Sequence, residues 1–180
     1  TLILILTKGP HRRRFGPERW WDWKRQCRLA VELYRKYNDA VVLLPSAVHI
    51  TGHCSEIEYY RDELKRDGLT VSLQNPDGRN VLVLESVGQE TIGQIKRGYQ
   101  FADALGMRLV VVSTPFHFLR VLYLCYGMHA THKIAWGIPN LTEAVTDSVL
   151  AVFFPIIDWL GFGEDYKAWA TKHRESGKHV

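Results

Sequence analysis

The sequence predicts an α/β protein of three layers, with a mainly parallel sheet covered by helices on both faces. Short, wholly apolar runs such as Leu2–Leu6 are typical of strands that are buried on both sides. These runs alternate with amphipathic segments of helical length, a pattern that favours parallel strands joined by helical crossovers. At 180 residues, with 46% hydrophobic and 23% charged residues, the chain is expected to form one domain with a full core.

The first part of the chain is expected to hold two strands and two helices. A helix over residues 18–37 places a stripe of mainly apolar side chains on one face: Trp20, Trp23, Cys27, Ala30, Val31 and Tyr34. A second buried strand spans residues 40–44. Ser55 and Glu58 have the spacing of a capping box, which predicts a helix that ends near Gly68.

The middle of the chain predicts two strands followed by a helix. Residues 70–74 and 80–85 have strand character, and the turn Asn75-Pro76-Asp77-Gly78 between them favours a hairpin. The next helix is expected over residues 91–105, because Gly106 supplies a stop signal.

The last part begins with a buried strand over residues 108–113 that leads directly into a helix ending near Tyr126. A weak strand over residues 131–136 precedes a helical extension, residues 137–180. Within the extension, the apolar run Val149–Leu160 is interpreted first as a core helix. If its outer face is exposed, it is instead a contact for a second copy, forming a homodimer, or for lipid.

The net charge of +4 is unevenly placed. Residues 8–36 hold ten Lys or Arg against three acidic residues, a local charge of +7, so the rest of the chain carries −3. This local excess favours an anionic small molecule as partner. Binding of single-stranded nucleic acid through the basic, Trp-rich segment is a weaker alternative, because its tryptophans lie on the face expected to pack inward.

Compartment is inferred from cysteine use and hydropathy. The three cysteines lie far apart, which favours reduced thiols in a cytoplasmic protein. No apolar run reaches the length of a membrane span. The alternative of a membrane anchor that preceded Thr1 and was removed stays open.

Two groups of polar residues follow predicted strands and form the main candidate site. His117 and Arg120 are three residues apart and therefore share one face of a helix. The imidazole of His117 can titrate and the guanidinium of Arg120 is a permanent cation, and both would lie beyond the strand ends, where a ligand binds. The full set is Glu85, Ser86, Thr91, Gln94, Ser113, Thr114, His117 and Arg120. We expect neighbouring strands to bring the two groups together. The alternative is that these are helix caps and solvated surface charges.

The loop after the first strand is a second candidate. Gly9 allows close backbone approach to a ligand, and Lys8 and Arg12, with the two arginines that follow, would neutralise phosphate. The Gly-x4-Gly-Lys-Ser/Thr pattern of a P-loop is absent, and a solvated loop is an equally good interpretation. No metal site is expected, because His49, His53 and Cys54 lie in a probable loop without an accompanying Glu.

The pattern Glu85-Ser86-x4-Thr91-x2-Gln94, followed by Ser113-Thr114-x2-His117-x2-Arg120, resembles the YdcF/SanA/ElyC family over roughly residues 1–128. Arg25 or Arg28 resembles an early arginine of that family. The resemblance implies a Rossmann-like sandwich with a polar pocket, a link to envelope metabolism, and binding of an adenosyl-type ligand such as S-adenosylmethionine. Ser46 stands where the family has Gly-Gly, and Gln94 where it has Asn.

These observations predict an enzyme that transfers or hydrolyses a group on a phosphorylated or nucleotide-like substrate, adenosyl compounds included. Arg120 would clamp the anion and His117 would act as general acid or base, with Glu85 as a second acid/base or a partner of sugar hydroxyls. Thr91, Gln94, Ser113, Thr114 and Ser46 would bind the ligand. The alternatives are a binding module for a nucleotide or S-adenosylmethionine without chemistry, and an accessory protein of envelope metabolism.

Overall fold

The computed structural model describes residues 1–7, 21–45, 56–69, 71–72, 81–84 and 91–136, and single residues or short groups between 145 and 165. The strands are β1 (Leu2–Ile5), β2 (Val41–Pro45), β3 (Val71–Ser72), β4 (Val81–Leu84), β5 (Leu109–Ser113) and β6 (Thr131–Ile134). The helices are α1 (Trp21–Lys36), α2 (Glu56–Arg66), α3 (Thr91–Ala104), the 3-10 turn η2 (Pro115–His117) and α4 (Phe118–Gly127).

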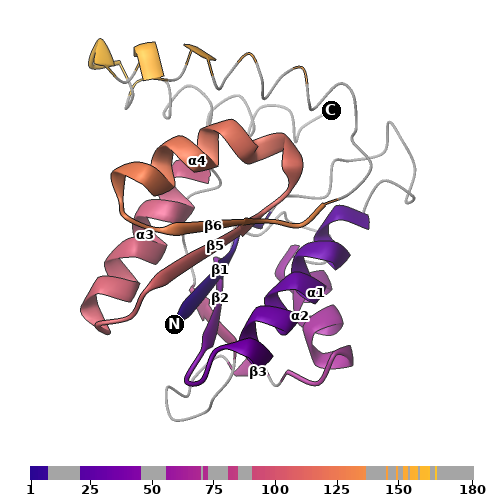
Figure 1. Cartoon of the computed structure of the whole chain (residues 1–180). Coiled ribbons are helices and arrows are strands. Elements are labelled where there is room, and N and C mark those ends of the chain that lie inside the picture. Colours follow the sequence, from indigo (N-terminus) through magenta and orange to yellow (C-terminus); the bar gives the residue numbers. More distant parts are fainter. Residues whose placement is uncertain are drawn as a thin grey trace.

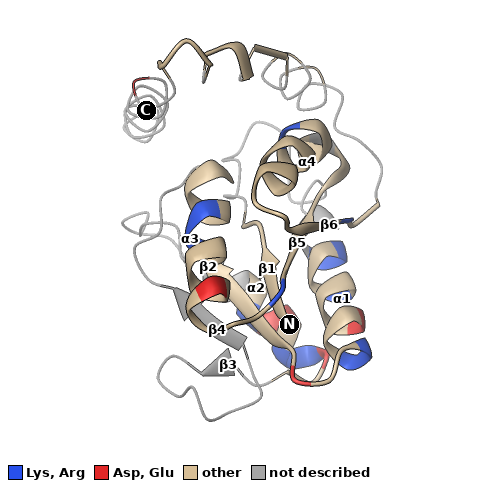
Figure 2. Ribbon diagram, turned by 60° about the vertical axis from the view of Figure 1, so that its left-hand side comes forward, with Lys and Arg blue, Asp and Glu red and all other residues tan. Residues whose placement is uncertain are grey.

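The six strands form one parallel sheet in the order β3-β4-β2-β1-β5-β6. β1 lies near its centre, between β2 and β5, and its four residues are fully buried. An uninterrupted apolar run is what a strand covered on both faces requires, and none of β1, β2 and β5 contains a charged residue (Figure 2).

Helices cover both faces of the sheet, so the three-layer, Rossmann-like architecture predicted from the sequence is confirmed (Figure 1). Successive side chains of β1 point to opposite faces. Ile3 and Ile5 pack with residues of α1 and α2. Leu2 and Leu4 pack with residues of α3 and α4. The two hydrophobic layers are therefore separated by the sheet itself.

Helix α3 lies very close to β1. A Cβ built on Gly98 would lie 2.8 Å from Cδ2 of Leu4, so only glycine fits at this contact without displacing the leucine. The contact fixes the depth of α3 on the sheet. The first turn of α3, which begins at Thr91, lies at the carboxyl edge of the sheet, where Gln94 bonds to Thr7 just beyond β1.

The hairpin expected between residues 70–74 and 80–85 is wrong. β3 pairs with β4 in parallel, with Val71 opposite Val81 and Ser72 opposite Leu82. A hairpin joins antiparallel strands, so the parallel pairing of β3 with β4 excludes it. The turn residues themselves lie outside the described part of the chain.

The interpretation of residues 149–160 as a core helix is also wrong for the side chains that the structure describes there. Val149, Val152, Phe153, Ile156, Trp159 and Leu160 are between 49% and 83% exposed. Their spacing places them within one helical stripe, so the apolar face that was expected to pack inward faces solvent. A homodimer contact through this stripe stays a prediction.

Up to residue 136, the other described elements agree with the expected ones to within a few residues. Helix α1 buries Cys27, Ala30 and Val31, the described core of the predicted stripe, whereas the side chains of Trp20 and Trp23 lie outside the described residues. Gly68 and Gly106, just beyond α2 and α3, adopt φ of +90° and +61°. Both glycines therefore provide the left-handed helix stops that the sequence predicts.

Candidate functional site

Polar residues follow the two central strands β1 and β5 at the carboxyl edge of the sheet. Thr7 lies two residues after β1, and Thr114 directly follows β5, the parallel neighbour of β1. After β1 the chain leads to α1 on one face, whereas after β5 it leads to α4 on the other. Such a reversal leaves a crevice beyond the strand ends where ligands bind in open parallel sheets.

We use the name strand-end site for the described polar residues at this position: Thr7, Thr91, Gln94, Thr114, His117 and Arg120. They come from the end of β1, the first turn of α3, and the segment from the end of β5 into α4. Distant parts of the sequence therefore contribute to one edge of the sheet.

Arg120 joins the two helices of the site. Its Nη2 donates to Oγ1 of Thr91 at 3.2 Å and to Nδ1 of His117 at 3.0 Å. Thr91 is the first residue of α3, where backbone N–H groups lack helical partners and the helix dipole favours negative charge. A permanent cation beside a helix N-terminus is an arrangement suited to an anion.

The contact with Arg120 identifies the hydrogen-bond acceptor on the imidazole ring of His117. A guanidinium has no lone pair and can only donate, so Nδ1 of His117 must be unprotonated when it accepts this bond. The proton of the neutral ring is then on Nε2. In this arrangement the basic nitrogen of His117 is occupied by Arg120.

A buried network links α3 to the ends of β1 and β2. Nε2 of Gln94 donates to the carbonyl oxygen and to Oγ1 of Thr7, at 3.3 and 3.2 Å. The Thr7 hydroxyl in turn donates to the carbonyl oxygen of Pro45 at 2.9 Å. These bonds satisfy polar groups at strand ends that would otherwise be buried without partners.

Two buried side-chain oxygens of the strand-end site have no hydrogen-bond partner among the described residues. They are Oε1 of Gln94 and Oγ1 of Thr114, whose side chains belong to residues only 2% and 1% exposed. Buried groups of this kind are rare in folded proteins and cluster where a ligand or an ordered water completes the site.

Ser113 and His132 form a pair beside the strand-end site. Oγ of Ser113 lies 2.5 Å from Nε2 of His132 on β6, and the ring of Phe118 stacks on the imidazole with centroids 5.8 Å apart. Burial lowers the pKa of His132 to about 4, so the ring is neutral at physiological pH. The pair ties the segment that holds Thr114 and His117 to the edge strand.

This shift predicts a pH dependence of stability. The folded pKa of His132 lies below its ordinary value of 6.5, so between pH 6.5 and about 4 the unfolded chain binds more protons than the folded chain. Stability should therefore fall as the pH is lowered through this window. Because His132 is only partly buried, we expect a loss of about 1–2 kcal/mol, less than the full shift would give.

Urea unfolding at pH 7, 5.5 and 4.5 measures this loss. His132→Gln retains an amide that can reach Ser113 but does not titrate, so its stability should decrease less than that of the wild type. An equal decrease in both proteins would assign the effect to other groups.

The structure describes six of the predicted site residues and brings them to one edge of the sheet. Thr91, Gln94, His117 and Arg120 meet as expected, with Ser113 and Thr114 beside them. The reason given for this meeting is wrong, however, because β4 and β5 are not neighbours: β2 and β1 lie between them. It is α3, crossing beneath those two strands, that brings Thr91 and Gln94 to β5. Glu85, Ser86, Lys8, Gly9, Arg12 and Ser46 lie outside the described residues.

Two residues of this region were not predicted from the sequence. Thr7 is not among the predicted site residues, although it follows β1 as Thr114 follows β5. The signal that could have singled it out is that shared position at a strand end. His132 is not among the predicted site residues, and its pairing with Ser113 depends on the register of β5 and β6.

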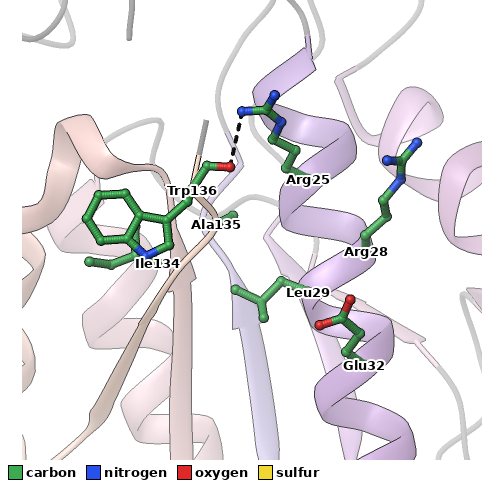
Figure 3. A pocket seen from close by; sticks show the side chains of 7 residues that line it. All are labelled: Arg25, Arg28, Leu29, Glu32, Ile134, Ala135 and Trp136. Atoms are coloured by element: carbon green, nitrogen blue, oxygen red, sulfur yellow. Dashed lines mark hydrogen bonds between the residues drawn. The ribbon is translucent and has the colours of Figure 1, made fainter. Parts of the chain in front are cut away.

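A separate cavity of about 240 Å³ lies between α1 and the end of β6. It is lined by Arg25, Arg28, Leu29, Glu32, Ile134, Ala135 and Trp136. Figure 3 shows the guanidinium of Arg25 reaching across to the carbonyl oxygen of Trp136, at an N–O distance of 3.1 Å. Arg25 and Arg28, either of which resembles the early arginine of the family named above, therefore line this cavity.

Within the part of the chain that the structure describes, no group of three or more His, Cys, Asp or Glu side chains is arranged to hold a metal ion. In that same part, none of the helices combines the length and the apolar character needed to cross a bilayer. Cys27 and Cys125 are buried free thiols. Comparison with protein-family models, curated proteins and solved structures found no match to this chain.

Proposed function

We propose that this protein is an enzyme that binds a phosphorylated or nucleotide-like small molecule at the strand-end site and transfers or hydrolyses a group on it. The observation that supports this most is the position of Arg120. Its guanidinium bridges Thr91 and His117 beside the N-terminus of α3. This position lies beyond β1 and β5, the neighbouring strands after which the chain crosses to opposite faces of the sheet.

The residues of the site have separate roles in this proposal. Arg120 holds the anionic group of the ligand with charge-assisted hydrogen bonds. Thr91 and the backbone N–H groups of the first turn of α3 add neutral donors. An adenosyl ligand such as S-adenosylmethionine would present a carboxylate to the same cation.

His117 acts as the acid/base once the ligand is bound. An anion that draws Arg120 toward itself releases Nδ1 of His117, which then accepts a proton from the attacking water or hydroxyl. As the new bond to the transferred group forms, the bond to the leaving oxygen breaks, and that oxygen takes the proton back from His117. Glu85 keeps its proposed role as a second acid/base or as a partner of sugar hydroxyls.

The second candidate function is a binding module without chemistry. The specific observation in its favour is that the basic nitrogen of His117 is occupied by Arg120, which suits an anion receptor as well as an enzyme. The two functions differ in turnover and agree on where the ligand binds.

A thermal-shift panel with nucleotides, sugar phosphates, S-adenosylmethionine and phosphate tests the proposed ligand class. A ligand present at a hundred times its Kd should stabilise the protein by about 2.7 kcal/mol. Any ligand that shifts the Tm is then assayed for turnover with the wild type and with His117→Asn, which retains a polar side chain but cannot take up a proton.

An enzyme should lose turnover about 100-fold or more in His117→Asn while its affinity changes only a few-fold. Turnover that persists in the variant excludes proton transfer by His117. Binding without turnover in the wild type favours the receptor, and no shift with any ligand overturns both functions.

A further inference from the structure

Only one of the two polar groups of the Gln94 side-chain amide makes hydrogen bonds to described residues. Its Nε2 makes two hydrogen bonds to Thr7, whereas its Oε1 is buried and has no partner among the described residues. A carbonyl oxygen accepts hydrogen bonds and cannot donate them. The open position on Gln94 is therefore specific for a donor group.

The network around Thr7 fixes which end of the amide is open. The Thr7 hydroxyl donates its one hydrogen to the carbonyl oxygen of Pro45, so it can only accept from Gln94. The backbone carbonyl of Thr7 is likewise an acceptor. Both partners require the NH2 group of Gln94, so a rotation of the amide that would exchange its oxygen and nitrogen is excluded.

The open acceptor belongs to the helix that also carries Thr91, a partner of the proposed anion clamp. Gln94 follows Thr91 by three residues on α3, so the two side chains lie on the same face of the helix. Thr91 accepts a hydrogen bond from Arg120, the proposed anion clamp. A second buried oxygen without a described partner, Oγ1 of Thr114, lies directly before the turn that holds His117.

We propose that the ligand of the strand-end site is a phosphorylated polyhydroxyl compound, in which a hydroxyl group close to the phosphate donates to Oε1 of Gln94. This inference rests on the proposed function and narrows it. Arg120 selects the phosphate, and Gln94 selects the hydroxyl that accompanies it. Thr114 can serve as either donor or acceptor to a further hydroxyl.

The matched probes are glycerol 3-phosphate and propyl phosphate, two three-carbon phosphate monoesters that differ only by two hydroxyl groups. Isothermal titration calorimetry gives the Kd of each, with inorganic phosphate as reference. The wild type should bind glycerol 3-phosphate at least tenfold more tightly than propyl phosphate. This comparison needs no variant and therefore stands even if a substitution at Gln94 disturbs folding.

Gln94→Met removes the acceptor with little change in side-chain length. In this variant the two monoesters should have nearly equal Kd values, because glycerol 3-phosphate should bind more weakly whereas the Kd of propyl phosphate should change little. Gln100→Met is the matched control, because it makes the same chemical change at an exposed position of the same helix. It should leave the preference intact.

The outcomes separate this inference from the function on which it rests. If all three phosphates bind to the wild type with similar Kd, or if Gln94→Met retains the preference, the assignment of a hydroxyl to Gln94 is overturned and the anion site stands. If neither the monoesters nor phosphate binds, both are overturned.

Discussion

Replacing Arg120 with alanine is expected to weaken phosphate binding about 100-fold, equivalent to about 3 kcal/mol. The guanidinium is the only cation of the strand-end site within the described residues, and it bridges Thr91 and His117 there. Hydrogen bonds to a charged group are stronger than neutral ones, and a buried anion without its counter-charge is strongly disfavoured. Isothermal titration calorimetry with inorganic phosphate and with a phosphate monoester measures the loss.

Two further variants define the cause of that loss. Arg120→Lys keeps the charge but not the planar fork, so it should retain only part of the affinity. Arg97→Ala is the control, because it removes an arginine from the exposed surface of α3, where the side chain bonds only to Gln100 among the described residues. Equal losses from Arg120→Ala and Arg97→Ala would show that general charge, and no particular site, attracts the anion.

Gly98→Val should destabilise the fold by about 2–3 kcal/mol, because it forces extra atoms into a packed interface. Even the first added carbon would lie 2.8 Å from Cδ2 of Leu4, whose side chain is fully buried and packed within the core. Valine has a better helix propensity than glycine, but that gain is only a few tenths of a kcal/mol. The steric cost is larger, so the net effect of Gly98→Val is a lower free energy of unfolding.

Urea unfolding of Gly98→Val and Gly127→Ala measures the effect against a control on a neighbouring helix. A Cβ at Gly127, the last residue of α4, meets nothing within 4 Å, so this substitution should change stability little. If Gly98→Val is as stable as the wild type, α3 lies further from β1 than the structure places it. The same variant should also weaken ligand binding, since α3 positions Thr91 and Gln94.

Features that depend on local patterns could be predicted from the sequence. The apolar runs of β1 and β5 identify buried strands, and the three-residue spacing of His117 and Arg120 brings their side chains to one face. Glycines at the ends of α2 and α3 provided equally local stop signals. Each of these depends on the period of a single strand or helix, which the sequence encodes directly.

Features that depend on strand order could not be predicted in this way. The turn after β3 has the composition of a hairpin, yet parallel pairing of β3 with β4 prevailed, because pairing is decided by the whole sheet. The same is true of His132, whose contact with Ser113 requires β6 to pair with β5 in one register. Local propensity is a weak guide where tertiary packing selects the arrangement.

The central position of β1 has a consequence for the order of folding. The sheet aligns Leu2 with Leu109 and Ile5 with Val112, so its middle is assembled from segments more than a hundred residues apart. Closing so long a loop costs entropy before the contacts that reward it are made, which slows folding. During synthesis one edge of β1 therefore stays without its strand partner until β5 has emerged, and in that interval the apolar strand depends on helices, chaperones or both to prevent pairing with another chain.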